Sequence, residues 1–153
     1  MEMSALIAHV LGNLRGEKTD QGWVSAGDDA VFSLTPARYT NDTFDWWPDN
    51  YLHVAANPSN GYGGLIWYVT GERAKKAQDE ISAHTWVSNN PEPPKFDPRV
   101  VRDPSYPRFH DPRSVIPTPL VRRALQEFCE VGTGDRPKCI EWALSDAHGA
   151  RFD

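Results

Sequence analysis

The segment 114–144 constrains the fold most, because it contains a helix with a recognisable beginning and end. Thr118 is a suitable N-cap and Pro119 a suitable first helical residue, since proline lacks the N–H group that the first turn cannot use. Gly132 fits the left-handed conformation that ends many helices. The apolar residues between these ends recur at helical spacing: Leu120, Val121, Ala124, Leu125, Phe128 and Cys129. The sequence therefore predicts a helix over 118–131 with one apolar face.

A strand is predicted shortly after this helix. Residues 138–142 alternate between two sides, which is the pattern of a half-buried strand. Cys139 of this strand and Cys129 of the helix are the two cysteines of the chain. A bridge between them is geometrically possible, but two reduced thiols are the preferred interpretation for a cytoplasmic protein. The helix, turn and strand form a unit that must pack on a sheet from the rest of the chain.

The remaining sequence contains several runs with strand-like patterns. The run 63–70 is nearly all apolar, as expected of a central strand covered on both faces, and the turn signal at 57–61 predicts a hairpin with the run 51–56. The other predicted elements are strands at 23–25, 30–35 and 85–88, a helix at 3–15 that Ser4 caps and Gly16 stops, and a short helix or loop at 71–83. We therefore predict a single α+β domain, 1–153, with an antiparallel sheet of about four to six strands and the 118–131 helix packed on one face.

Proline dominates the segment 89–113. It contains residues 91, 93, 94, 98, 104, 107 and 112 of the 13 prolines, interleaved with aromatic side chains. Proline lacks the N–H group that helices and sheet ladders need, so this segment is predicted to be a long loop. Its aromatic residues favour an ordered loop that packs on the sheet.

Composition bounds the partner and the compartment. The formal net charge is −5 and the isoelectric point is near 5.5, which argues against a nucleic-acid backbone as partner and suits a basic protein surface. No signal peptide is recognisable, and no apolar run approaches the length of a membrane span. The sequence therefore predicts a soluble, cytoplasmic protein with no membrane partner.

The sequence offers little support for catalysis. No two of the five histidines have the spacing of metal ligands, and the two cysteines do not either. His110 and Asp111 could form a dyad, but no serine or cysteine nucleophile stands beside them. The glycine-rich run 61–64 lacks the lysine and the following helix of a phosphate loop. We expect no enzyme, metal or cofactor; a small enzyme or a scaffold protein with a site near the His110 loop is the alternative.

Binding residues are expected instead on an acidic and aromatic surface. The stretch 41–50 places aspartates around large aromatic residues. Tryptophan is enriched in binding hot spots, and carboxylates beside it would meet lysine and arginine and speed association. A purely structural role, with the tryptophans in the core and the aspartates capping turns, is the alternative. The residues expected to contact a protein partner are Asp42, Asp45, Trp46, Trp47 and Asp49, with Phe109 and His110 of the proline-rich segment.

Three motifs in the second half of the chain form one pattern. Residues 116–128 read I-P-x-x-x-V-R-x-A-L-x-E-F, residues 132–137 read G-T-G-D-R-P, and residues 140–142 read I-E-W. This order resembles the C-terminal signature of immunity protein family one of bacterial polymorphic toxin systems. Asp135 stands in the turn where that family usually has a glutamate or a similar residue.

The resemblance extends upstream, since 51–54 and 61–65 are similar to the central hairpin of the family, and it covers roughly 45–142. It implies a small α+β immunity protein that binds a cognate secreted toxin domain and neutralises it, as a monomer in a 1:1 complex. Toxins linked to the family are often nucleic-acid deaminases, whose active site must admit a flipped base. The resemblance implies that the protein blocks the active site or the substrate-binding surface of such a toxin. The hypothesis that the acidic, aromatic surface makes this contact rests on composition and not on a family motif.

Overall fold

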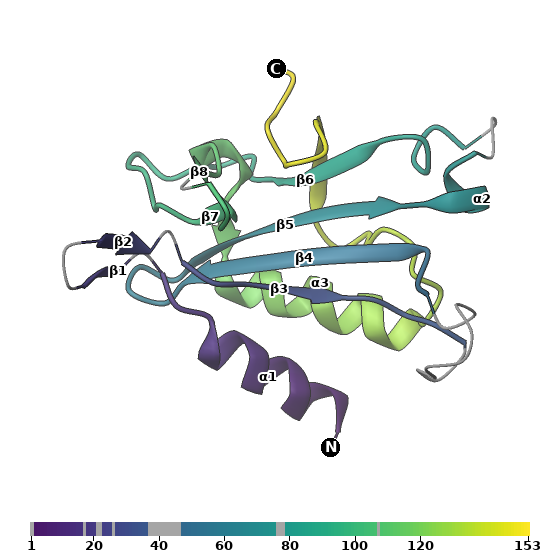
Figure 1. Cartoon of the computed structure of the whole chain (residues 1–153), viewed down its shortest axis with the longest axis horizontal. Helices are drawn as coiled ribbons and strands as arrows, with labels where there is room; N and C mark the ends of the chain where they lie inside the picture. Colours follow the sequence, from purple (N-terminus) through teal and green to yellow (C-terminus); the bar gives the residue numbers. More distant parts are fainter. Residues whose placement is uncertain are drawn as a thin grey trace.

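The computed structural model describes residues 2–16, 18–20, 23–25, 27–36, 47–75, 79–106 and 108–153. Within them an antiparallel sheet of six strands has the order β10-β6-β5-β4-β3, with β9 paired to β5 beside this path (Figure 1). The strands are β3 (Asp29–Phe32), β4 (Asn50–Asn57), β5 (Tyr62–Val69), β6 (Thr85–Asn89), β9 (Ile116–Pro117) and β10 (Glu141–Ser145). The predicted α+β class and the predicted number of strands are confirmed.

Strands β4 and β5 form the predicted hairpin at the centre of the sheet. They pair along their whole length, from Asn57 opposite Tyr62 to Asn50 opposite Val69. Gly61 closes the turn with φ of +75°, a conformation that glycine adopts without steric cost. Strand β5 also pairs with β6 and β9, so neighbouring strands enclose it, as its apolar sequence predicted.

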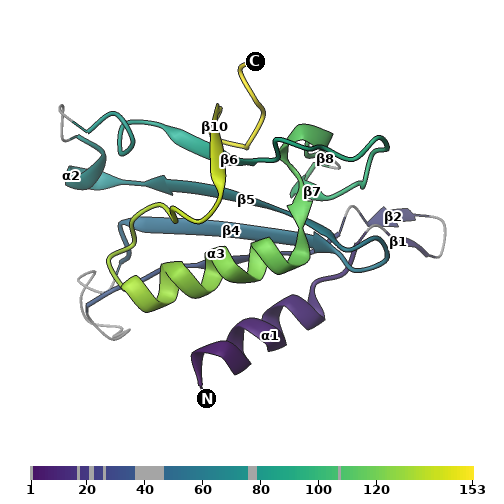
Figure 2. The same cartoon turned by 180° about the vertical axis from the view of Figure 1, so that it is seen from behind.

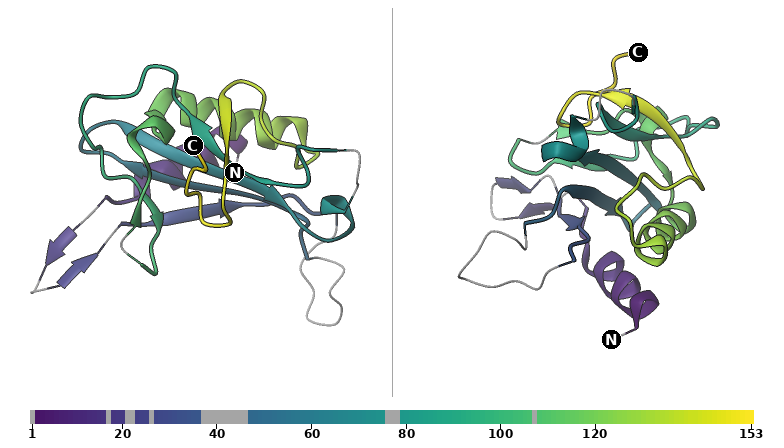
Figure 3. Two further views of the ribbon diagram at one scale, coloured as in Figure 1. Left: turned by 90° about the horizontal axis from the view of Figure 1, so that it is seen from above. Right: turned by 90° about the vertical axis from the view of Figure 1, so that its right-hand side faces the viewer.

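Two helices cover one face of the sheet, and Figures 2 and 3 show both on the same side. They are α1 (Met3–Asn13) and α3 (Thr118–Val131), and α3 has the predicted bounds. Their buried side chains join every second residue of the central strands in one core: Ile7, Leu11, Leu52, Val54, Leu65, Trp67, Val121, Leu125 and Phe128. Gly63 allows the close approach of α3, since a Cβ there would lie 2.9 Å from Cγ2 of Val121.

The bounds of α3 are as predicted, but the residue at its N-cap is not. Pro117, with extended φ and ψ of −55° and 141°, is the residue that precedes the helix, and no side chain caps it. Thr118 is not the N-cap, because β9 runs directly into the helix and the Thr118 N–H donates to the carbonyl of Gly61 over 2.9 Å. The carbonyl of Gly61 therefore accepts a hydrogen bond from the first N–H group of the helix, which has no partner within the helix itself. At the other end Gly132 has φ of +72°, which confirms the predicted stop.

The boundaries of α1 and β10 also differ from the prediction. Helix α1 is preceded by Glu2 rather than Ser4 and ends before Gly16, at Asn13. The strand predicted at 138–142 is β10, which begins only at Glu141. The N–H of Lys138 donates to the side chain of Glu127 on α3, so the chain is still held to the helix where the alternation had suggested a strand.

The proline-rich segment packs on the opposite face of the sheet, as predicted. Val100 and Val101 of this segment, with Val115 just after it, form a second core with Ala55 of β4. The sequence did not predict its short elements, which are the hairpin of β7 (Val101–Asp103) and β8 (Arg108–Phe109) and the 3₁₀ turn η1 (Pro112–Ser114). The other short elements are the paired strands β1 (Lys18–Asp20) and β2 (Trp23–Ser25) and the one-turn helix α2 (Gly71–Ala74).

Candidate functional site

Four carboxylates gather at the end of the sheet where β4 begins and β5 ends. Asp49, Glu72, Asp79 and Asp135 line a hollow of about 480 Å³, together with Arg73 and Ser82. We call these four carboxylates the acidic rim. They come from four separate segments of the chain. Arg73, the cationic side chain in this described lining, pairs with Asp49 and Asp135, so the lining has more carboxylates than cations. A surface of this kind attracts cationic groups.

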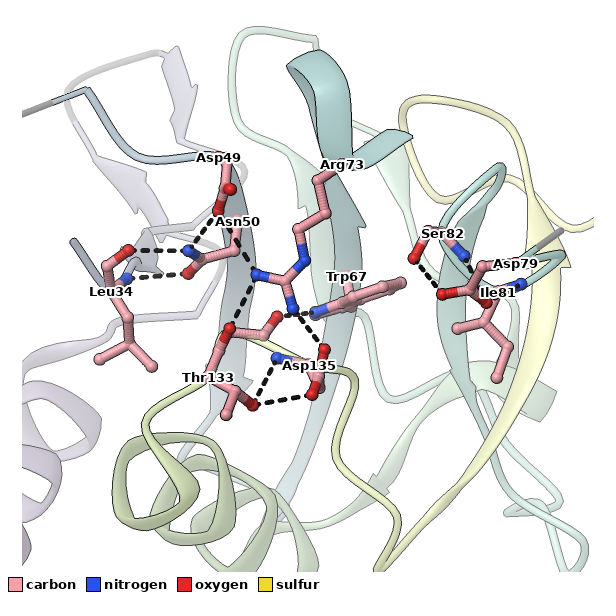
Figure 4. A network of polar contacts seen from close by, with 11 residues as sticks. Leu34, Asp49, Asn50, Trp67, Arg73, Asp79, Ile81, Ser82, Thr133 and Asp135 are labelled. Atoms are coloured by element: carbon pink, nitrogen blue, oxygen red, sulfur yellow. Dashed lines mark hydrogen bonds and ion pairs between the residues drawn. The ribbon is translucent and has the colours of Figure 1, made fainter. Parts of the chain in front are cut away.

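Arg73 holds two of these carboxylates in place (Figure 4). Its Nη1 donates to the carbonyl of Thr133 over 2.7 Å and to Oδ1 of Asp49 over 3.4 Å, and its Nη2 is paired with Asp135. The hydroxyl of Thr133 donates to the second oxygen of Asp135 over 2.8 Å. Only 20% of the Arg73 side chain is exposed, so the charges near it are less screened than on an open surface. The carboxylates are therefore ordered before any partner arrives.

The turn that carries Asp135 is fixed to the sheet from below. The indole Nε1 of Trp67 on β5 donates to the carbonyl of Gly134 over 3.0 Å. Gly134 has φ of +77°, and a Cβ there would lie 2.7 Å from Nδ2 of Asn50. The Asn50 amide in turn makes two hydrogen bonds with the backbone of Leu34, of 2.7 and 2.8 Å. The buried side chains of Trp67 and Asn50 thus fix the position of the turn that carries Asp135 relative to the sheet.

Asp79 organises the rim on the opposite side of the hollow. Its Oδ2 accepts from the hydroxyl of Ser82 over 2.6 Å, and its Oδ1 accepts from the N–H groups of Ile81 and Ser82 (Figure 4). Asp79 therefore caps a turn and faces the hollow at the same time. Sequence reasoning assigned 71–83 only to a polar helix or loop and missed Glu72, Arg73 and Asp79. Their charge was visible in the sequence, but their meeting with Asp135 depends on the fold.

The structure brings together only part of the set of residues predicted to bind a partner. Asp49 belongs to the acidic rim, and Trp47, two residues earlier, is 61% exposed. Asp42, Asp45 and Trp46 lie outside the described residues. Phe109 and His110 lie elsewhere, against the beginning of β5, where a Cβ on Gly64 would be 2.6 Å from Cδ2 of His110. Phe109 is half-buried under the guanidinium of Arg99, 4.1 Å from the ring centroid.

His110 is a buried residue rather than a surface one. The residue is 3% exposed, and its Nδ1 has no hydrogen-bond partner among the residues that the structure describes. Burial, and secondly the positive charge of Arg102, lower the pKa of His110 to about 3, so the imidazole is neutral at physiological pH. Asp111 does not orient it, because its carboxylate accepts two hydrogen bonds from the guanidinium of Arg113, of 3.0 and 2.9 Å. These bonds lower the pKa of Asp111.

Other types of site receive no support from the described part of the chain. Within it, no group of three or more histidine, cysteine, aspartate or glutamate side chains could hold a metal ion. No described helix is long and apolar enough to cross a membrane. Cys129 and Cys139 are half-buried and unbridged, and burial raises the pKa of both thiols.

The fold and the acidic rim together define a small α+β domain with a charged surface suited to a protein partner. The family model of immunity protein Imm1 matches residues 4–144, nearly the whole chain, so the protein belongs to this family of immunity proteins. The resemblance inferred from the C-terminal motifs is thereby confirmed. No significant match was found among curated proteins or among solved structures.

Proposed function

We propose that this protein binds a cognate toxin domain one-to-one in the cytoplasm of the producing cell. It blocks the toxin by covering its active site or its substrate-binding surface. Membership of the Imm1 family supports a toxin as the partner. We propose further that this toxin is a nucleic-acid deaminase, since such toxins are often linked to the family that the motifs resemble.

The acidic rim is the observation that carries this proposal. An enzyme that acts on a nucleic acid must bind phosphates, and it does so mainly with lysine and arginine. Carboxylates can occupy the positions that phosphates take in the substrate complex. Asp49 and Asp135 are already held by Arg73, so little conformational freedom is lost when they meet a cationic surface. Trp47, two residues before Asp49 in the sequence, is exposed and offers apolar area.

A charge reversal tests the role of the acidic rim. The side chain of Glu72 is 94% exposed and makes only a 3.7 Å ion pair with Lys75, so Glu72→Lys leaves the fold intact. We expect the variant to associate with the toxin domain roughly tenfold more slowly at low salt, and the difference to shrink as salt is added. Stopped-flow or surface plasmon resonance measures both rates. Glu92→Lys is the matched control, because Glu92 is an exposed glutamate of the proline-rich segment.

The class of function is tested separately. The toxin domain encoded beside this protein should be lethal alone, harmless on co-expression, and inhibited at an equimolar ratio in a deamination assay on single-stranded DNA and RNA. Failure of the wild-type protein to bind this domain would refute the proposed function. Turnover of a substrate by the isolated protein, lost in His110→Gln, would favour the alternative of a small enzyme.

A further inference from the structure

The described residues cover one face of the sheet only in part. Helices α1 and α3 cover the first face, and the proline-rich segment packs over the second face near Ala55 and Gly64. Toward the acidic rim, the second face presents residues of β3, β4 and β5 that point away from the helices. Among them the apolar side chain of Val31 is 49% exposed, although it stands on a strand of the sheet and opposite His53.

Three rings form a rigid stack on this uncovered face. Tyr51 and Tyr68 are direct cross-strand neighbours, with ring centroids 5.0 Å apart and an interplanar angle of 21°. His53 stacks on the other side of Tyr68, at 5.6 Å and 26°. We call this stack the aromatic ridge. All three rings are half-buried, so each still offers part of its surface to solvent.

Polar contacts fix the aromatic ridge before any partner binds. The hydroxyl of Tyr51 donates to the carbonyl of Pro48 over 3.1 Å, and the hydroxyl of Tyr68 lies 3.3 Å from Nε2 of His53. Nδ1 of His53 is 3.6 Å from the carboxylate of Asp29 on β3. Rings held in this way lose little rotational freedom on binding, which is the physical reason that tyrosines are effective in binding sites.

Carboxylates stand at both ends of the aromatic ridge. At one end the contact of Tyr51 with Pro48 joins it to Asp49 and hence to the acidic rim. At the other end Asp29 and Asp103 line a hollow of about 350 Å³. The guanidinium of Arg102, which also lines this hollow, donates to two backbone carbonyls, over 3.2 and 3.0 Å, and these bonds hold it against the protein. The surface thus has an aromatic centre between two groups of carboxylates.

We propose that the uncovered sheet face, with Val31 and the aromatic ridge at its centre, is the surface on which the toxin domain docks. The toxin surface that fits it has an apolar centre flanked by lysine or arginine side chains. In this arrangement the aromatic ridge supplies most of the affinity and slows dissociation, while the acidic rim steers association. The inference rests on the proposed function and adds to it the central contact and the complementary chemistry of the partner.

A buried charge is the sharpest test. In the free Val31→Glu variant, water solvates the new carboxylate. In the complex, the docked toxin would cover this carboxylate and offer no cation or hydrogen-bond donor to it. We expect the dissociation constant to rise roughly 100-fold or more, because a desolvated, unpaired charge costs several kcal/mol. Val131→Glu is the matched control, since Val131 is 60% exposed at the end of α3, on the helical side of the sheet. Circular dichroism and thermal melting verify that both variants fold.

A second variant keeps the test decisive if Val31→Glu fails to fold. Tyr68→Ala should raise the dissociation rate at least about tenfold and leave the association rate nearly unchanged, the opposite of Glu72→Lys. Tyr106→Ala is its control, because Tyr106 is 64% exposed on the β7–β8 turn. Unchanged dissociation in both Val31→Glu and Tyr68→Ala would overturn the docking surface, while slower association of Glu72→Lys would leave the proposed function standing. A dimeric wild-type protein would also overturn the proposed docking surface if Val31→Glu made it monomeric and the variant still bound the toxin as tightly as the wild type.

Discussion

Lowering the pH from 7 to 5 should reduce the free energy of unfolding by about 2 kcal/mol through His110 alone. The pKa of this histidine is lowered from 6.5 to about 3 in the folded protein, because its ring is buried against β5 and near Arg102. The folded state therefore keeps the imidazole neutral, whereas the unfolded chain takes up a proton below its ordinary pKa. The stabilisation is complete above that ordinary value and is lost progressively as the pH falls toward about 3.

The magnitude follows from linkage. Each pH unit between the two pKa values changes the unfolding free energy by about 1.4 kcal/mol. At pH 5 the unfolded imidazole is about 97% protonated and the folded one is almost entirely neutral, which gives about 2 kcal/mol relative to pH 7. Asp111, Asp146 and Asp153 also have lowered pKa values, but their ordinary value is 3.8, so their loss falls mainly below this window.

Urea denaturation at several pH values between 5 and 7 measures the effect. His110→Gln is the control, because a glutamine has a similar size, keeps a polar group beside the backbone and does not titrate in this range. Its overall stability is expected to fall, but its unfolding free energy should change little between pH 7 and pH 5. A wild-type protein with equal stability at both pH values would refute the reasoning, and so would a His110→Gln variant with the same pH dependence as the wild type.

Three substitutions test the packing that positions the site. Gly64→Ala should destabilise by about 1–3 kcal/mol in chemical denaturation, because its Cβ would overlap the buried imidazole; unchanged stability would mean that the ring can move. Trp67→Phe should cost about 2–3 kcal/mol and loosen the turn at Gly134, visible as faster amide exchange there; protection equal to the wild type would contradict the role of the indole bond. Arg73→Gln should cost about 1 kcal/mol at low salt and less at high salt, since the carboxylates it separates then repel each other; a salt-independent loss would argue against an electrostatic cause.

Sequence patterns predicted the parts of the fold whose interactions are local. The period of α3, its stop at Gly132 and the β4–β5 hairpin depend on neighbouring residues, so a reading along the chain recovers them. The N-cap of α3 was not predicted correctly, because it depends on a distant residue. The Thr118 N–H donates to the carbonyl of Gly61, which lies far back in the sequence. The same limit explains β10, whose beginning depends on a contact with Glu127 of the preceding helix.

The candidate site was recovered less completely for a related reason. Asp49 was identified because it stands in a conspicuous acidic and aromatic stretch, whereas Glu72 and Asp79 stand in a segment with no motif and Asp135 stands in a turn motif that gave no indication of a binding role. His110 was expected at the surface because it lies among prolines. It is buried because Gly64 has no side chain, and a Cβ there would lie 2.6 Å from Cδ2 of the ring. Gly64 is far from His110 in sequence, so no local pattern reports the space that it leaves for the ring.

The turn motif of residues 132–137 stabilises the fold, so its presence carries little information about the partner. Arg136 lies over the rings of Trp86 and Trp142, 4.4 and 5.9 Å from their centroids, and so joins the turn to β6 and β10. Gly134 receives the indole bond of the central strand. Of the residues proposed to meet the toxin, Val31, Tyr68 and Glu72 lie outside the motifs that carry the resemblance. Asp135 lies in the turn motif, and Tyr51 and His53 lie in the family-like run 51–54. A family can therefore keep its turn and still change its partner, and exchanging the uncovered sheet face between two members should transfer toxin preference while the turn stays as it is.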